Sequence, residues 1–511
     1  MFKIKRVLVS VYEKKNIELL IPFFIKENIE VYSTGGTYKH LKTLSTKLKL
    51  TEISTLTNFP EILNGRVKTL HPNVHAGILA KKNNIHKKEL AKLNIKFFDM
   101  VIVNLYPFEE TIMNKKNSFD DCIEQIDIGG PTLLRAAAKN FQNVIILSNP
   151  EQIRLFSNQI SKTNSVSLNT RKKLAGEAFK TTAYYDSVID NWFNKGGHDF
   201  LNCNSSLPMK RIRNLRYGEN PHQKASLYKY GSNEINQISG KEVSYNNIVD
   251  LDVAINLAHE FEKPSCVIVK HGNPCGVSTN EKQKNAFLNA LESDPISAFG
   301  GIIAFNKTLN YETAEKINSI FIELVIAPKI SKKARMILAK KKNLILIEYF
   351  LNKSERVKYE IRTTKTFLLA QEVNDRKLMA SDLKLVTKGK LTDQQIRDML
   401  FGFTICKYIN SNAIVLVERG KVLGIGVGQT NRLDSTIQAI KRGLKKSINK
   451  KSITLASDGF FPFPDIIQLC KKHSISSIIQ PGGSIKDDAI IKEANKNNIK
   501  MVFTGIRNFK H

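Results

Sequence analysis

Lys270 and His271 stand side by side at the end of a short apolar run, Val267 to Val269, and Pro274-Cys275 follows them. The apolar run predicts a buried strand, and α/β proteins often place their chemistry at the end of a strand. A lysine beside a histidine could transfer protons and stabilise an oxyanion. The same pair could also be half of a metal site, or a strand end that simply reaches solvent.

The spacing of the neighbouring residues tests the metal site. Zinc deaminases combine a His-x-Glu motif with a later Pro-Cys-x-x-Cys motif. Here Ser278 stands where the second cysteine belongs, and Asn273 stands where the glutamate belongs. The sequence therefore argues against zinc. Proton transfer and a solvated strand end both stay open.

A Gly-Gly turn near the N-terminus could bind a phosphate. Residues 33–37 read Ser-Thr-Gly-Gly-Thr and lie between a predicted strand and a predicted helix. Free N–H groups at a helix N-terminus, together with hydroxyl side chains, bind anions. An ordinary tight turn would explain the same residues.

Two further stretches carry charged groups at suggestive spacings. Arg66 and Lys68 are two residues apart, so an extended segment would place both cations on one face, either at a ligand or at a solvated strand edge. Asp127 precedes Gly129 to Pro131, which predicts a helix start beside a carboxylate that could do acid–base work. Lys139 follows in the same predicted helix. It could face the anion site, or it could only offset the helix dipole.

The order of the apolar runs predicts an α/β protein with two domains. Residues 1–150 alternate short apolar strands with amphipathic helices, which implies a parallel sheet covered by helices on both faces. A long amphipathic helix is predicted over residues 170–193. The stretch after it is rich in Gly, Asn and Ser and has no periodicity, so we expect domains over residues 1–197 and 198–511.

Composition narrows the class of protein. The chain has 511 residues and is 42% hydrophobic, which is typical of a globular protein, and no run approaches the ~20 apolar residues of a membrane span. The six cysteines are scattered without a Cys-x-x-Cys pair, which predicts reduced thiols. The N-terminus lacks the pattern of a signal peptide, so we expect a cytoplasmic location.

The formal net charge of +31 first suggests nucleic acid. The lysines, however, occur singly and in pairs, and patches rather than totals mark a nucleic-acid surface. A solvated basic surface or an attraction for small anionic substrates explains this pattern better. We therefore expect neither a nucleic-acid partner nor a membrane partner.

Residues 424–429, Gly-Ile-Gly-Val-Gly-Gln, resemble a dinucleotide-binding fingerprint but have Gln429 where the third glycine belongs. They also follow Glu-Arg-Gly-Lys-Val, which predicts a turn between two strands rather than a turn from a strand into a helix. The sequence thus argues against a nicotinamide cofactor.

A series of motifs along the chain resembles one enzyme family, the bifunctional AICAR transformylase/IMP cyclohydrolases. The first part matches the cyclohydrolase domain through SVYEK (10–14), STGGT, GRVKTLHP, NLYPFEET (104–111) and DIGGPTLLRAAAKN. The second part matches the transformylase domain through LRYGENPHQ (215–223), VKHGNPCG, DPISAFGG (294–301), KYINSN (407–412), GIGVGQTNR (424–432), SDGFFPFPD (457–465) and TGIRNFKH.

The resemblance implies a fold and two reactions. The fold would be a methylglyoxal-synthase-like parallel-sheet domain, followed by a transformylase domain of two cytidine-deaminase-like α/β subdomains. A formyl group would pass from 10-formyltetrahydrofolate, a co-substrate, to the amine of AICAR. Formyl-AICAR would then close its ring, with loss of water, to give IMP. No bound cofactor or metal is implied, and the family's transformylase sites imply a homodimer.

The resemblance also implies residue roles. In formyl transfer His271 would be the base, Lys270 would stabilise the oxyanion or protonate the departing nitrogen, and Asn412 would polarise the formyl oxygen. AICAR would be held by Arg216, Tyr217, Phe299, Gly300, Glu323, Phe460 and Arg507, and the folate by Arg432 and Asp458. In ring closure the phosphate would be bound by Lys14, Ser33, Thr34, Gly35, Gly36, Thr37, Arg66 and Thr69. Proton movement and oxyanion stabilisation would fall to Lys68, Tyr106, Asp127 and Lys139.

Overall fold

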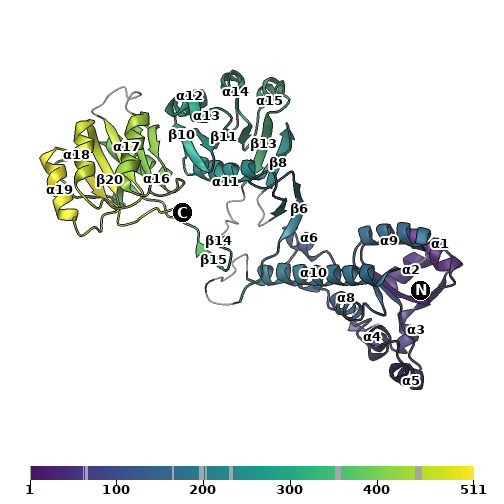
Figure 1. The fold of residues 1–511 in the computed structure, drawn as a ribbon. Helices are drawn as coiled ribbons and strands as arrows, with labels where there is room; N and C mark the ends of the chain where they lie inside the picture. The colour runs from purple at the N-terminus through teal and green to yellow at the C-terminus, as the bar shows by residue number, and fades with distance from the viewer. Residues whose placement is uncertain are drawn as a thin grey trace. The chain divides into compact units, whose positions relative to one another are not determined.

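The computed structural model describes residues 2–60, 62–63, 67–163, 166–194, 201, 204–229, 234–351, 358–443 and 452–511. Contacts divide the chain into two compact units, Met1–Lys210 and Arg211–His511 (Figure 1). The predicted domain boundary at 197/198 lies outside the described residues, and it stays a prediction. Within the described ranges, no helix is both long enough and apolar enough to cross a membrane.

The first unit contains a five-stranded parallel sheet in the order β3-β2-β1-β4-β5. Its strands are short, and β1, β4 and β5 are mostly apolar, as predicted for a parallel sheet with both faces buried, whereas the edge strand β3 reads Lys-Leu-Thr-Glu. They are β1 (Arg6–Val11), β2 (Glu30–Ser33), β3 (Lys49–Glu52), β4 (Met100–Asn104) and β5 (Ile145–Leu147).

Helices cover both faces of this sheet, because alternate residues of each strand point to opposite sides. Val7 and Val9 pack into one core with α1, α2 and α9, whereas Leu8 packs into the other with α4, α8 and α10. The helices of the unit are η1 (Ile17–Leu20), α1 (Ile21–Lys26), α2 (Gly35–Leu44), α3 (Ile53–Thr57), α4 (Pro72–Leu79), α5 (Asn84–Lys92), α6 (Phe108–Met113), α7 (Phe119–Glu124), α8 (Gly129–Lys139), α9 (Pro150–Thr163) and α10 (Leu168–Phe193).

The second unit is built around one twelve-stranded sheet, in the order β16-β21-β20-β19-β17-β18-β10-β9-β11-β12-β13-β8. Its first half contains β8 (Glu234–Ser239), α11 (Tyr245–His259), β9 (Ser265–Lys270), β10 (Asn273–Thr279), α12 (Gln283–Ser293), α13 (Pro295–Ala298), β11 (Ile302–Phe305), α14 (Tyr311–Asn318), β12 (Leu324–Ala327), α15 (Lys332–Leu338) and β13 (Ile345–Phe350). Its second half contains β16 (Lys384–Leu385), α16 (Asp393–Cys406), β17 (Ile414–Glu418), β18 (Lys421–Gly426), α17 (Arg432–Gly443), β19 (Ile453–Ser457), α18 (Asp465–Lys472), β20 (Ile475–Gln480), α19 (Asp487–Lys496) and β21 (Lys500–Phe503).

The two halves repeat the same order of elements. In each half a helix (α11 or α16) is followed by an antiparallel hairpin (β9-β10 or β17-β18), after which helices alternate with parallel strands. An antiparallel edge strand, β8 or β16, completes each half. The hairpins meet where β10 pairs with β18, at Ser278 and Lys421. The expectation of an α/β chain is thus confirmed, and the second unit consists of two similar α/β halves.

The cores of the second unit follow from this repeat. On one face of the sheet, α11 and α16 share a single apolar core that runs through both halves. On the other face each half has its own core, the first under α12, α14 and α15 and the second under α17, α18 and α19. Two small two-stranded sheets complete the described elements: β6 (Lys210–Leu215) pairs with β7 (Ala225–Lys229), and β14 (Tyr359–Thr363) pairs antiparallel with β15 (Leu368–Glu372), while η3 spans Ala380–Asp382.

Candidate active sites

The carboxyl ends of β1, β2 and β4 lie side by side in the first unit, because Val9 pairs with Ser33 and Val11 pairs with Asn104. The loop after β1 is held there by Asn104, whose Oδ1 accepts from the N–H groups of Tyr12 (2.6 Å) and Glu13 (3.0 Å). This loop carries Lys14, whose Nζ donates to the carbonyl of Tyr12. The sequence analysis missed Asn104, because a single asparagine at a strand end has no distinctive pattern.

The predicted phosphate turn opens α2, with Thr34 as the residue before its first turn. The hydroxyls of the turn are already used: Ser33 is fully buried and donates to the carbonyl of Val9, and Thr37 donates to the carbonyl of Val11. The backbone N–H groups of Gly35 and Gly36 remain the anion donors, since the first N–H groups of a helix have no intrahelical partner. Nothing lies within 4 Å of where a Cβ on Gly36 would sit, so a ligand could approach there.

Asp127 sits at the start of α8 in a partly buried position. Its Oδ1 accepts from the N–H of Gly130 at 2.7 Å, and its own N–H donates to the Tyr185 hydroxyl at 2.8 Å. A Cβ on Gly130 would lie 2.4 Å from Asp127 Oδ2, so only glycine allows this approach. Burial raises the pKa of the Asp127 carboxyl, while the N–H groups of Gly130 and Tyr106 and the charge of Lys68 act to lower it.

Two other predicted residues, Tyr106 and Thr69, lie around the same strand ends. Tyr106 follows β4, and its ring lies 5.7 Å from that of Tyr12. Thr69 is buried, and its hydroxyl lies 3.1 Å from where a Cβ on Gly129 would sit, at the first residue of α8. Arg66 lies outside the described residues.

Lys139 lies apart from this group in the structure, and its role in ring closure stays a prediction. It is the last residue of α8, and ten residues of helix rise separate it from Gly129, or about 15 Å. Together with Arg135, Lys172 and His75 it lines a separate cavity of about 660 Å³.

In the second unit, Lys270 and His271 belong to a hairpin rather than a simple strand end. Lys270 pairs with Asn273 across β9 and β10, which leaves His271 and Gly272 as a two-residue turn. Both have positive φ, 54° and 71°, as a type I′ turn requires. Lys270 Nζ donates to the carbonyl of Phe299 at 2.6 Å.

Asp250 of α11 holds this turn and was missed by the sequence analysis. Its Oδ1 accepts from the N–H of Gly272 at 2.5 Å, and its carboxylate also accepts from the N–H of His271. Burial raises the pKa of Asp250, and these two N–H groups act to lower it. An aspartate inside an amphipathic helix usually indicates a solvated face. Nothing in the sequence therefore predicted that Asp250 binds the turn.

Predicted AICAR-binding residues adjoin the hairpin. Gly300 has a positive φ and donates its N–H to the carbonyl of Phe321, and the Phe299 ring lies 5.0 Å from that of Phe321. Glu323 is the residue before β12 and accepts from Asn247 Nδ2 at 3.1 Å. β11 pairs with both β9 and β12. The strand ends that carry Lys270, Gly300 and Glu323 therefore lie next to one another, at the same end of these three strands.

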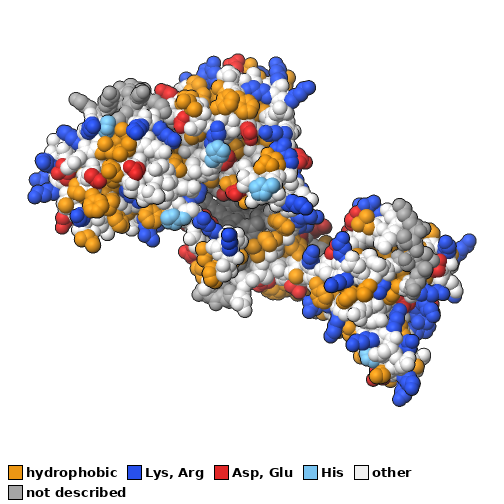
Figure 2. All heavy atoms as spheres, in the orientation of Figure 1, with side chains coloured by type: hydrophobic (Ala, Val, Ile, Leu, Met, Phe, Trp, Pro, Cys, Tyr) orange, Lys and Arg blue, Asp and Glu red, His pale blue; other side chains and the backbone are white. Residues whose placement is uncertain are grey.

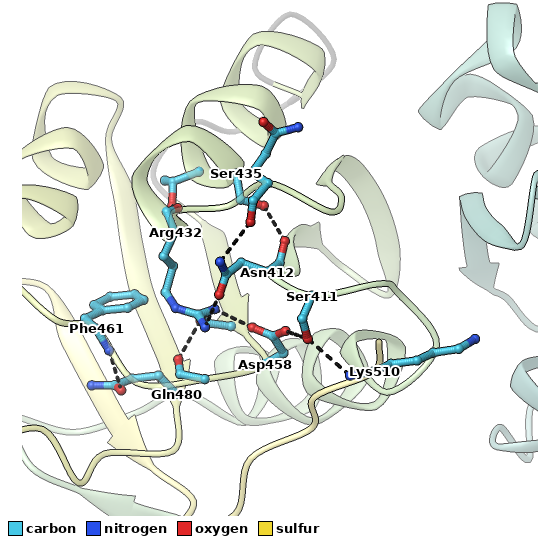
Figure 3. A network of polar contacts seen from close by, with 12 residues as sticks. Ser411, Asn412, Arg432, Ser435, Asp458, Phe461, Gln480 and Lys510 are labelled. Atoms are coloured by element: carbon cyan, nitrogen blue, oxygen red, sulfur yellow. Dashed lines mark hydrogen bonds and ion pairs between the residues drawn. The ribbon is translucent and has the colours of Figure 1, made fainter. Parts of the chain in front are cut away.

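Asn412 is the centre of a polar network in the second half (Figure 3). Its Oδ1 accepts from Arg432 Nη2 at 2.6 Å, and its Nδ2 donates to the carbonyl of Gln429 at 2.8 Å. Arg432 Nη1 donates to Asp458, and the other oxygen of Asp458 accepts from the Ser411 hydroxyl at 2.6 Å.

Arg432 and Asp458 face each other in the structure, and their predicted contact with folate stays a prediction. The side chain of Arg432 is only 6% exposed and that of Asp458 is 0% exposed, and each is occupied by the other. A buried charge needs such a partner, because its desolvation is otherwise costly. In this structure the pair orients Asn412, because Arg432 Nη2 donates to its Oδ1.

The hairpin and the Asn412 loop are connected within the second unit. Asn273 donates its Nδ2 to the carbonyl of His271 at 3.1 Å and accepts from the N–H of Asn410 at 3.0 Å. His271 and the loop that ends at Asn412 are thus joined through a single side chain.

Of the remaining predicted residues, Arg216, Phe460 and Arg507 are exposed and Tyr217 is half-buried. The guanidinium of Arg216 stacks over the Tyr217 ring at 4.7 Å, and Phe460 is 42% exposed. Arg507 lies over the ring of Phe509 at 4.9 Å, and Arg432 lies 5.9 Å from the same ring. These contacts place Arg507 beside the Asn412 network.

Cys275 lies beside the hairpin as a free thiol. Burial raises its pKa to about 12, so the thiol stays protonated at neutral pH. Among the described residues, no three His, Cys, Asp or Glu side chains gather closely enough to hold a metal ion.

The positive charge is dispersed. On the face that Figure 2 shows, Lys and Arg side chains are scattered among polar and apolar ones over the described parts of both units. Such dispersal is consistent with a solvated basic surface.

The chain is similar to known proteins over nearly its whole length. Residues 137–442 match the family model of the AICARFT/IMPCHase bienzyme, and residues 17–132 match that of the MGS-like domain. Proteins named "Bifunctional purine biosynthesis protein PurH" from Caldicellulosiruptor saccharolyticus, Clostridium perfringens (strain SM101 / Type A) and Fusobacterium nucleatum subsp. nucleatum are 46%, 45% and 43% identical to it. Each alignment covers 99% of this chain and 100% of the relative.

Replacing Asp127 with asparagine should stabilise the first unit at neutral pH. A carboxyl whose folded-state pKa is raised costs stability once the pH exceeds its unfolded-state pKa, and an uncharged amide avoids this cost. The gain in unfolding free energy of Asp127→Asn over the natural protein should therefore grow as the pH rises from the unfolded-state pKa, 3.8, to the raised folded-state pKa. The single tryptophan, Trp192 in α10, allows unfolding of this unit to be followed by fluorescence. A gain independent of pH would contradict the assignment of a raised pKa.

Proposed function

The chain belongs to the AICARFT/IMPCHase bienzyme family, and we propose that it transfers the formyl group at the His271 hairpin and closes the ring at the strand ends of the first unit. It is a bifunctional AICAR formyltransferase and IMP cyclohydrolase of purine synthesis. The observation that carries the formyl-transfer assignment is the meeting of Lys270, Phe299 and Glu323 at one sheet edge, beside a fixed His271.

In formyl transfer, the exocyclic amine of AICAR attacks the formyl carbon of 10-formyltetrahydrofolate, the co-substrate of the reaction. His271 accepts the proton that this amine loses as the new C–N bond forms. Lys270 stabilises the tetrahedral oxyanion or supplies the proton that the folate nitrogen takes up when the old C–N bond breaks. Asn412 has one Nδ2 hydrogen on the carbonyl of Gln429, and the second donates to the formyl oxygen.

Residues around His271, Lys270 and Asn412 bind AICAR in this proposal. Phe299 offers an exposed ring, and Glu323 lies at the same sheet edge. We assign AICAR binding to Arg216, Tyr217, Phe299, Gly300, Glu323, Phe460 and Arg507. The ion pair of Arg432 and Asp458 acts through Asn412, which it orients.

Ring closure joins the carboxamide nitrogen of formyl-AICAR to its formyl carbon and releases the formyl oxygen as water. The reaction is intramolecular, so positioning supplies much of the acceleration. The N–H groups of Gly35 and Gly36, with Lys14, bind the phosphate. Asp127, whose carboxyl pKa is raised by burial, acts with Lys68 and Tyr106 on the reacting atoms.

The partners follow from these reactions: AICAR, formyl-AICAR, IMP and reduced folate. All are anionic, which suits a chain with a formal net charge of +31. Five cysteines are free thiols in the structure, and we propose a cytoplasmic enzyme on the ground that free thiols persist in a reducing compartment.

Variants of the hairpin test the formyl-transfer site. His271→Ala and Lys270→Ala should each lose formyl transfer by roughly 10²–10⁴-fold, the usual effect of a positioned acid–base group. Cyclisation of supplied formyl-AICAR should be unchanged, because that chemistry belongs to the other unit. Cys275→Ser is the matched control and should be nearly silent, with or without a chelator. Full formyl transfer by His271→Ala would end the assignment of the base.

A fragment of residues 1–197 should cyclise formyl-AICAR by itself, because the residues proposed for ring closure all lie within it. A fragment of residues 1–210 is the matched control, since Ser206 donates to Asp190 and Lys210 pairs with Glu109 in the first unit. Cyclisation is followed by absorbance, and folding by the fluorescence of Trp192. Two folded fragments without activity would show that ring closure needs the second unit.

We expect the enzyme to be a homodimer, as the resemblance implies for the transformylase sites. The exposure of Phe299, at 63%, agrees with a site that a second copy completes. Analytical ultracentrifugation at micromolar concentration should give a dimer. A monomer that retains full formyl transfer would contradict this.

A further inference from the structure

The turn that carries His271 is held in place by one carboxylate, that of Asp250 in α11. A non-glycine residue with positive φ is disfavoured, and His271 has a φ of 54°. Asp250 compensates by accepting both N–H groups of the turn, from His271 and from Gly272. Hydrogen bonds to an ionised carboxylate are among the stronger ones in proteins. This contact therefore fixes the backbone position from which the His271 side chain extends.

The second half of the unit contains the same arrangement without the histidine. Arg419 and Gly420 form the turn between β17 and β18, with φ values of 50° and 69°. Asp398 of α16 accepts from their N–H groups at 2.9 and 2.8 Å. Asp250 and Asp398 each stand six residues after the N-cap of their helix, Ser244 or Thr392.

The two turns have different surroundings. The carbonyl of Gly420 accepts from the N–H of Thr279 at 3.0 Å and from the Ser278 hydroxyl at 3.2 Å, so the second turn helps to join the halves. The turn of the first half is instead linked through Asn273 to the loop that leads to Asn412. One copy of the arrangement therefore serves assembly, and the other carries residues proposed for chemistry.

We infer that Asp250 is a positioning residue for formyl transfer, which holds the backbone of His271 so that its imidazole reaches the amine of AICAR. The inference rests on the proposed role of His271 as the base. Asp250 acts only through His271, since its carboxylate is occupied by the turn. Asp398 is the internal control, with the same contacts and without a role in the reaction.

Paired substitutions in the full chain test this inference. Asp250→Ala should lower kcat for formyl transfer by about 10- to 100-fold, the range that a small misplacement of a reacting group can cost, with little change in the KM for AICAR. Asp250→Asn should lose less, because the amide oxygen still accepts one N–H of the turn. Asp398→Asn, matched to Asp250→Asn, should leave formyl transfer within about 2-fold, since positioning of His271 does not depend on it. Cyclisation of formyl-AICAR should be unchanged in all of them.

A double variant separates positioning from general damage to the fold. If Asp250 acts through His271, then adding Asp250→Ala to His271→Ala should cause no further loss of formyl transfer. Multiplied losses in the double variant, or equal losses in Asp250→Asn and Asp398→Asn, would overturn the inference. If His271→Ala were inactive and Asp250→Ala fully active, the inference about Asp250 would be wrong, while the proposed role of His271 would stand. A fully active His271→Ala would remove the proposed base and the inference with it.

Discussion

Burial of both faces of the two main sheets is the constraint on which the rest of the structure depends. Helices cover both sides of each sheet, so the faces offer no room for a nucleotide. A ligand can therefore bind only at the strand ends, where the loops can carry polar residues. Both candidate sites follow this rule: one lies after β1, β2 and β4, and the other lies where the ends of β9, β11 and β12 meet.

Features that depend on local periodicity could be predicted from the sequence. The β-α-β rhythm of the first 150 residues predicted the parallel sheet, and the long amphipathic stretch predicted α10, which the structure places at Leu168–Phe193. The turn at Arg419-Gly420 was also predicted, because a glycine between two apolar runs is a familiar hairpin signal. The run of motifs along the chain predicted the family, which the comparisons confirm.

Features that depend on distance through space could not be predicted. The hairpin at His271 was interpreted as a strand end, since a histidine at positive φ is an uncommon turn residue. Lys139 was expected beside Asp127, but helix rise separates them. Arg432 and Asp458 are charged residues that bury each other, and Asp250 is an aspartate whose partners lie on a strand hairpin elsewhere in the chain. Asp250 and Gly272, like Arg432 and Asp458, are more than twenty residues apart in sequence. The distance of Lys139 from Asp127 depends instead on the number of turns in α8.

The repeated halves of the second unit bear on how such an enzyme could arise. A chain with the same order of helices and strands twice over is what duplication of one ancestral α/β module would leave. After such an event one copy can take over assembly, as the turn at Gly420 does by joining the two hairpins. The other copy is then released to accumulate changes that serve a substrate. After such divergence, the catalytic turn would still be held by the aspartate contact that both copies inherited.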